Sequence, residues 1–107
     1  MDFQFNTGNK VDGDARMDEH FEARFRQRLA RFESRLSRIE VHVRDVDGTR
    51  RSGPNGIEAG IEARPKSGDP IRVTERGETP EAAVGAALQT LVGRLDSIFG
   101  KSDRVRP

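Results

Sequence analysis

Apolar side chains recur at helical spacing in the first third of the chain. Phe21, Phe25, Leu29, Phe32 and Leu36 follow one another at steps of four, four, three and four residues. Residues at these steps form one stripe along a helix, and such a stripe is normally buried against other elements. We therefore predict an amphipathic helix that runs to about Leu36, with the phenylalanines in the core.

Four other segments alternate apolar and polar residues, which is the spacing of a β-strand with one buried face. These segments are residues 2–6, 39–45, 57–64 and 71–76. A second helix is predicted after the last of them, because Thr79 suits an N-cap and Pro80 suits the first helical position. Its apolar face is predicted to carry Val84, Leu88, Leu91, Leu95 and Ile98.

The predicted order is β-α-β-β-β-α. A helix connects the first two strands, so we expect them to be parallel, whereas the later strands follow as an antiparallel meander. Each strand has only one apolar side, and both helices must therefore cover the same face of the sheet. The sequence predicts a two-layer α+β domain over residues 1–100, with a four-stranded mixed sheet and a flexible tail at 101–107. The opposite face is expected to be open to water and to carry Gln4, Glu40, His42, Arg44, Glu58, Glu62 and Arg72.

Composition narrows the classes of protein. The 107 residues are enough for one domain with one core. The chain has no cysteine, which excludes disulfides, thiolate nucleophiles and cysteine zinc sites. No apolar run approaches the roughly 20 residues of a membrane span, and the start lacks the apolar core of a signal peptide. A soluble cytoplasmic protein is the expectation.

Basic residues recur about a quarter-turn from the apolar stripe. Segment 24–38 contains six arginines and one acid, although the formal net charge of the chain is only +1. Such segregation creates a local positive field, and arginine suits bidentate contact with phosphate. The alternative is an ordinary solvated helix face. Four arginines at steps of four, three and four, extended by one histidine toward the N-terminus, make up this stripe: His20, Arg24, Arg28, Arg31 and Arg35.

Catalytic and metal-binding patterns do not emerge from the sequence. The two histidines, His20 and His42, fall on different predicted elements, and no set of metal ligands accompanies either. Glu58 and Glu62 project from one strand face and are interpreted as a wet sheet surface, since nothing indicates a pocket around them. We expect no enzymatic activity, no metal and no cofactor.

The helix end and the following strand resemble a known family. The stretch LARFESRLSRIEVHVRDVDG at 29–48, with FQFNTGNKVDGD before it and IEARPKSGDPIRVTERGETPEAAVGAALQTLVGRL after it, resembles the ribosome hibernation-promoting factors, also called ribosome-associated translation inhibitors. The likeness spans residues 2 to about 98. It implies a fold related to double-stranded-RNA-binding domains and a non-enzymatic protein in the mRNA and tRNA channel of the small ribosomal subunit. It also implies the short form of the family, without the domain that dimerises ribosomes.

The resemblance also implies a binding site for rRNA, with neither DNA nor a membrane as a partner. The family uses basic residues on both helices, but here the second helix has only Arg94 before Lys101. That neutral surface favours an alternative function: a diverged interaction module that binds a protein partner, or a second copy of the chain, through the second helix. The residues expected to contact RNA are His20, Arg24, Arg28, Arg31, Arg35, Arg38, Arg94 and Lys101.

Overall fold

The computed structural model describes residues 1–7, 15–46 and 56–100. The predicted flexible tail lies outside these ranges. In chain order the elements are β1 (Asp2–Thr7), α1 (Ala15–Arg28), the 3-10 helix η1 (Ala30–Arg35), β2 (Leu36–Asp45), β3 (Ile57–Pro65), β4 (Ile71–Gly77), α2 (Pro80–Leu95) and the π-helical turn η2 (Asp96–Gly100).

The four strands form one mixed sheet in the order β1-β2-β3-β4. β1 and β2 are parallel, with Phe3 opposite Ile39. β2, β3 and β4 are antiparallel, and Val41, Ile61 and Val73 lie in register across them. The predicted α+β fold class, strand order and strand directions are confirmed.

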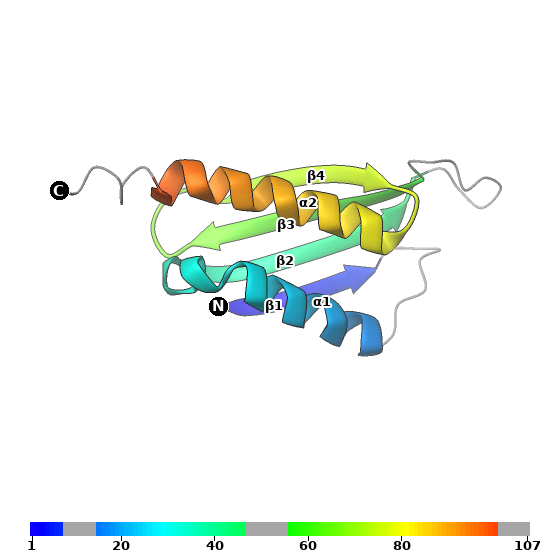
Figure 1. The fold of residues 1–107 in the computed structure, drawn as a ribbon, viewed down its shortest axis with the longest axis horizontal. Helices are drawn as coiled ribbons and strands as arrows, with labels where there is room; N and C mark the ends of the chain where they lie inside the picture. Colours follow the sequence, from blue (N-terminus) through cyan, green and yellow to red (C-terminus); the bar gives the residue numbers. More distant parts are fainter. Residues whose placement is uncertain (8–14, 47–55, 101–107) are drawn as a thin grey trace.

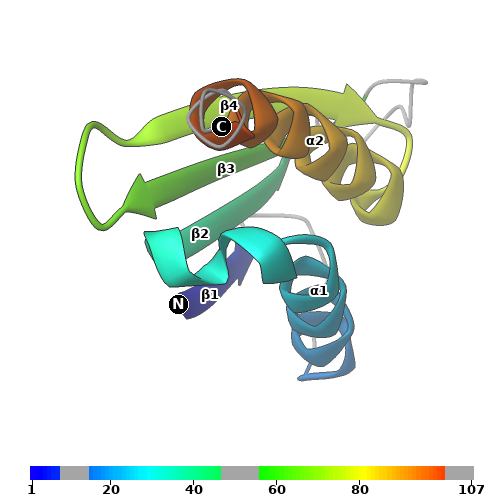
Figure 2. The same cartoon turned by 60° about the vertical axis from the view of Figure 1, so that its left-hand side comes forward.

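Both helices cover the same face of the sheet, with α1 over β1 and β2 and α2 over β3 and β4 (Figure 1; Figure 2). The core lies between these two layers, where apolar side chains are removed from water. It confirms the prediction that the phenylalanine stripe is buried. Its members are Phe21, Phe25, Leu29, Phe32, Leu36, Ile39, Val41, Val43, Ala59, Ile61, Ala63, Ile71, Val73, Ala83, Val84, Ala87, Leu88, Leu91 and Leu95.

The first helix ends earlier than the sequence predicts. α1 stops at Arg28, and the next turn is the 3-10 helix η1. The Phe32 N–H donates to the Leu29 carbonyl at 2.9 Å, a bond that spans three residues instead of four. Leu36 is fully buried as predicted, but as the first residue of β2 and not as the end of a helix.

The start of α2 matches the prediction and its end does not. The Ala82 N–H donates to the Thr79 Oγ1 at 3.0 Å, and Pro80 is the first helical residue. Ile98, however, is 44% exposed. The regular helix ends at Leu95, and the wider turn of η2 moves Ile98 away from the apolar face.

Candidate nucleic-acid interface

The predicted stripe of one histidine and four arginines lies along the line where α1 and η1 pass beside α2 and η2. We call these residues, His20, Arg24, Arg28, Arg31 and Arg35, the basic row, and the line between the helices the seam. Contacts from the row reach the second helix at several levels, and both helices run in the same direction (Figure 1). The residues of the basic row lie on α1 and η1, but several of their side chains also contact α2 and η2. The sequence alone does not indicate these contacts.

His20 and Arg24 mark the first half of the seam. The His20 Nε2 lies 3.6 Å from the Glu81 Oε1, between side chains that are both more than half exposed. Further along, the Arg24 guanidinium lies against Gly85 of α2: a Cβ atom at Gly85 would stand 3.4 Å from Nη2. A helix-interior glycine usually lowers helix stability. A Cβ at this position would be in ordinary van der Waals contact with the arginine, so the two helices lie close together here.

Arg31 and Arg35 interact with the second half of the seam. Arg31 Nη2 lies 2.6 Å from Asp96 Oδ1, and its guanidinium carbon stands 4.4 Å from the centre of the Phe32 ring. The guanidinium carbon of Arg35 lies 5.1 Å from the centre of the Phe99 ring. The Arg31 side chain is therefore already paired, because η2 supplies a carboxylate on that flank.

Within the basic row, Arg24 and Arg28 form no ion pair with a carboxylate of the described residues. Arg28 is exposed, and Arg24 is half-buried in the seam. Arg26 lies between Arg24 and Arg28 in the sequence, but it is outside the row and pairs with Glu22 at 2.9 Å. Within the basic row, Arg24 and Arg28 are therefore the residues best suited to bind an anion.

Arg38 does not belong to the basic row. It lies on β2 and points to the open face of the sheet, where its Nη2 donates to Gln4 Oε1 at 2.6 Å and contacts Glu40 Oε2 at 2.6 Å. The Arg38 Nε is buried and has no hydrogen-bond partner in the described residues. Because side chains alternate along a strand, Arg38 falls on the face opposite the helices. Arg38 therefore lies apart from the basic row, and its predicted contact with RNA stays a prediction.

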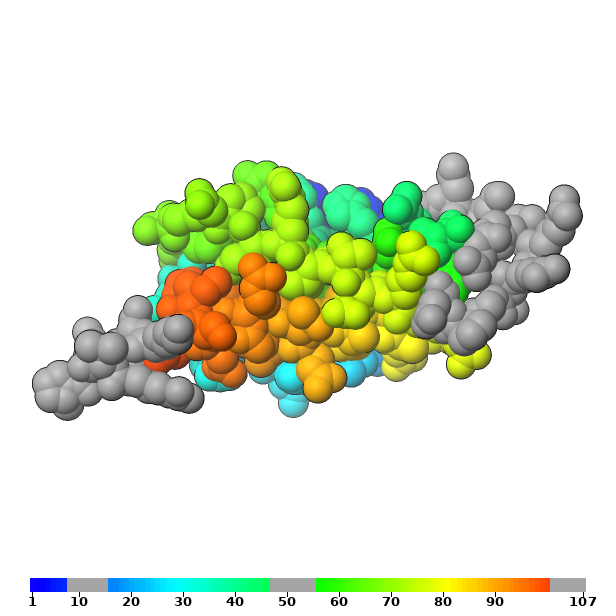
Figure 3. All heavy atoms as spheres, turned by 90° about the horizontal axis from the view of Figure 1, so that it is seen from above, coloured from blue at the N-terminus to red at the C-terminus, as the bar shows by residue number. Residues whose placement is uncertain are grey.

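Of the two basic residues that the sequence assigns to the second helix and its end, the structure describes only one. Arg94 is exposed on α2, while Lys101 lies outside the described residues. Ala82, Gln89 and Gly93 are exposed on the same helix and carry no charge. Figure 3, seen from the β4 side, shows α2 in yellow and orange as an exposed band beside β4. This surface adds little positive charge to the basic row.

The open face of the sheet is a layer of ion pairs. Glu58 is shared by Arg44 and Arg76, at 2.8 and 3.6 Å, and Glu62 is shared by Arg64 and Arg72, at 2.8 and 3.1 Å. The hydrogen bond from Arg72, aided by the charges of Arg64 and Arg72, lowers the pKa of Glu62. The predicted wet face is present, and each of these two glutamates pairs with two arginines, three of the four pairs joining neighbouring strands.

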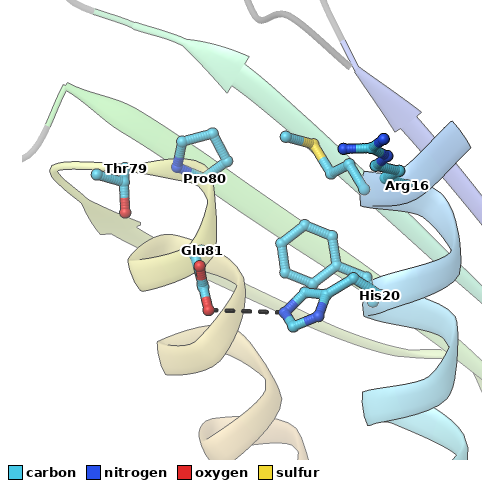
Figure 4. A pocket seen from close by; sticks show the side chains of 7 residues that line it. Arg16, His20, Thr79, Pro80 and Glu81 are labelled. Carbon is cyan, nitrogen blue, oxygen red and sulfur yellow. Dashed lines mark ion pairs between the residues drawn. The ribbon is translucent and has the colours of Figure 1, made fainter. Parts of the chain in front are cut away.

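A pocket of about 460 Å³ lies at the N-terminal end of the seam (Figure 4). Sequence reasoning missed most of it, because its walls come from two segments about 60 residues apart. Of its lining residues, only His20 was predicted to be a binding residue. The pocket is lined by Arg16, Met17, His20, Phe21, Thr79, Pro80 and Glu81.

Other kinds of site are not indicated by the described part of the chain. No three His, Asp or Glu residues gather there in a way that would hold a metal ion. None of the helices described is long and apolar enough to cross a bilayer.

Comparisons with known proteins agree with this fold. The model of the Sigma 54 modulation protein / S30EA ribosomal protein family matches residues 6–102. The Protein Y N-terminal domain from Thermus thermophilus is similar in structure, with a TM-score of 0.72 and 17% identity over 92% of this chain and 99% of that one. A ribosomal subunit interface protein from Coxiella burnetii has a TM-score of 0.62 and 15% identity over 94% and 99%.

The two structures share the fold, and at such low identity they show no more than that. No curated protein sequence matches the chain significantly. The family match is independent evidence, since it covers most of the sequence and agrees with the resemblance carried by the helix end and β2. The chain therefore belongs to the Sigma 54 modulation protein / S30EA ribosomal protein family, whose members are ribosome-associated hibernation factors.

Proposed function

We propose that this protein binds rRNA of the small ribosomal subunit in the decoding channel and inhibits translation when growth slows. The observation that carries the proposal is the pair Arg24 and Arg28, two guanidinium groups at the centre of the basic row without an ion-pair partner among the described residues. Family membership supports the ribosome as the partner.

The shape of the surface favours contact with the phosphate backbone. Guanidinium groups suit contact with phosphate, and structured RNA is bound largely through shape and charge. Binding in the channel would exclude mRNA and tRNA sterically, so the proposed inhibition requires no catalytic step.

Co-sedimentation with purified 30S subunits tests the proposal. The variant Arg24→Gln/Arg28→Gln is expected to remain in the supernatant at salt concentrations at which the wild type sediments with the 30S subunits, because two phosphate contacts are lost. Arg44→Gln/Arg64→Gln is the matched control: it removes the same charge from the open sheet face and leaves Glu58 and Glu62 one arginine each. Equal retention of both variants would exclude the basic row as the rRNA site.

A second candidate function is a protein-interaction module that uses α2. The exposed and uncharged residues Ala82, Gln89 and Gly93 favour it, since phosphate binding would call for cations there. The partner would be another protein or a second copy of this chain. Gly93→Arg would disrupt such an interface, whereas on the ribosome model it would leave 30S binding unchanged or strengthen it. Measurement of both in one pull-down separates the two functions.

A further inference from the structure

The pocket at the N-terminal end of the seam has the composition of a site for a flat polar ring. Its lining combines an apolar floor and walls from Phe21, Met17 and Pro80 with charged groups at the rim. Phe21 is almost fully buried and fixed by its contact with Phe5 of β1, at 5.1 Å between ring centres. A volume of about 460 Å³ is within the range of small-molecule sites.

The rim presents a donor and an acceptor side by side. His20 and Glu81 point toward each other from the two helices, with Nε2 and Oε1 3.6 Å apart (Figure 4). Both side chains are more than half exposed, and such a pair contributes little to stability. A ligand therefore displaces this contact at small cost and gains a carboxylate acceptor next to an imidazole donor.

That pair of groups complements one edge of one nucleobase. The Watson–Crick edge of guanine offers two adjacent N–H donors, at N1 and N2, beside the O6 acceptor. A carboxylate accepts both N–H groups together, while an imidazole N–H donates to O6. Adenine presents a donor and an acceptor in the opposite order, and the pyrimidines lack the paired N–H groups.

We infer that this pocket binds an unstacked guanine base of the RNA that the basic row holds. The inference rests on the proposed function for the source of the guanine. His20 belongs to both the row and the pocket, so a strand whose phosphates follow Arg24 and Arg28 arrives at this end of the seam. Bases turned out of the stack are recognised in this way, by apolar or aromatic surfaces and by hydrogen bonds to their edges. Arg16, exposed at the rim, is then placed to meet the phosphate of the same nucleotide.

Amide chemical shifts of the full chain, followed by NMR during titration with nucleoside monophosphates, test the pocket without the ribosome. Guanosine monophosphate is expected to shift the amides of Met17, His20 and Glu81 and to saturate at millimolar concentration. Inosine monophosphate lacks the N2 amino group. Adenosine monophosphate presents its hydrogen-bond donor and acceptor in the opposite order. Each is expected to bind about tenfold more weakly, the discrimination typical of a lost bidentate base contact.

The variant Glu81→Ala is expected to abolish the preference for guanine. Glu78→Gln is its control, because it changes an exposed acid three residues away that does not line the pocket. An unchanged guanine preference in Glu81→Ala, or shifts located elsewhere with all nucleotides, would overturn the inference. The 30S co-sedimentation of the Arg24 and Arg28 variants is a separate readout, so loss of the guanine site leaves the proposed function standing.

The source of the guanine is tested with a uridine oligonucleotide that contains one guanosine. If RNA is the ligand, this oligonucleotide binds more tightly than guanosine monophosphate and becomes weaker in Arg24→Gln/Arg28→Gln, because its flanking phosphates contact the row. Equal affinity for the oligonucleotide and the monophosphate would overturn the assignment to RNA and would indicate a free nucleotide.

Discussion

Phe25 joins the first helix to the first strand. Its side chain is fully buried, and its ring centre lies 5.2 Å from that of Phe3 in β1. Phe25→Ala is expected to lower the free energy of unfolding by about 3–5 kcal/mol, since a large cavity replaces the ring. That loss is a large part of the 5–15 kcal/mol typical of a domain. Urea unfolding measures it.

Phe99 provides the comparison. It is only partly buried at the end of η2, where its ring packs on Phe32 at 6.1 Å. Phe99→Ala is therefore expected to cost clearly less than the Phe25 variant. Equal losses of unfolding free energy in the two variants would mean that the burial of an aromatic residue does not predict its contribution to stability here.

The sequence was informative about which residues are buried. Phe21, Phe25 and Phe32 were predicted to be core from their spacing alone, because periodicity directly reports the side of an element that meets others. Ile98 was misplaced for the same reason: its spacing continues the stripe, but the backbone stops following the regular helical angle at Leu95.

Thr79 fixes the start of α2 and one wall of the pocket. Its Oγ1 accepts the Ala82 N–H at 3.0 Å, which satisfies one of the free donors at the helix start. Thr79→Ala is expected to lower the free energy of unfolding by about 1 kcal/mol, the usual cost of a lost N-cap. Thr79→Ser keeps the hydroxyl and is expected to recover most of it. An identical loss in both variants would assign the effect to the methyl group.

The boundary between α1 and η1 could not be predicted from the pattern. Leu29 and Phe32 are three residues apart, a step that fits both a 3-10 turn and an α-helix, and Leu36 is buried in either a helix or a strand. Over two turns, the apolar positions expected for 3.0 and for 3.6 residues per turn are too similar to distinguish a 3-10 helix from an α-helix.

The surroundings of the basic row could not be predicted for a different reason. The angle between two stripes on one helix says nothing about which element lies on that flank, and here α2 and η2 supply Glu81 and Asp96.

At the scale of the whole molecule, the open sheet face couples stability to acid. The hydrogen bond from Arg72 lowers the pKa of Glu62 below its ordinary value of 4.5, with the charge of Arg64 acting in the same direction. A carboxyl group with a lowered pKa stabilises the fold at neutral pH. This contribution disappears as the pH falls below 4.5 and through the folded-state pKa.

The corresponding prediction compares Glu62→Gln with the wild type by urea unfolding between neutral pH and pH 3. The wild type is expected to be the more stable protein at neutral pH, and the difference is expected to shrink as the carboxylate is protonated. A difference of the same size at both ends of the range would show that the ion pairs with Arg64 and Arg72 do not contribute through charge.

Asp96 limits the charge that the basic row offers to RNA. Its Oδ1 lies 2.6 Å from the Arg31 Nη2, so one of the row's guanidinium groups is already neutralised from the second helix. Asp96→Asn removes this competitor. Since each phosphate contact adds about 0.7 to 0.9 to the slope of log affinity against log salt, we expect a steeper slope by about that amount. Affinity for 30S subunits at low salt is expected to rise severalfold.

The control for this prediction is Asp69→Asn, which makes the same change of charge in the exposed loop between β3 and β4. Both variants raise the net charge by one, and long-range attraction therefore increases in both. Only Asp96→Asn also releases an arginine inside the basic row, so only this variant should change the number of phosphate contacts. Identical salt slopes for the two variants would show that Arg31 takes no part in binding.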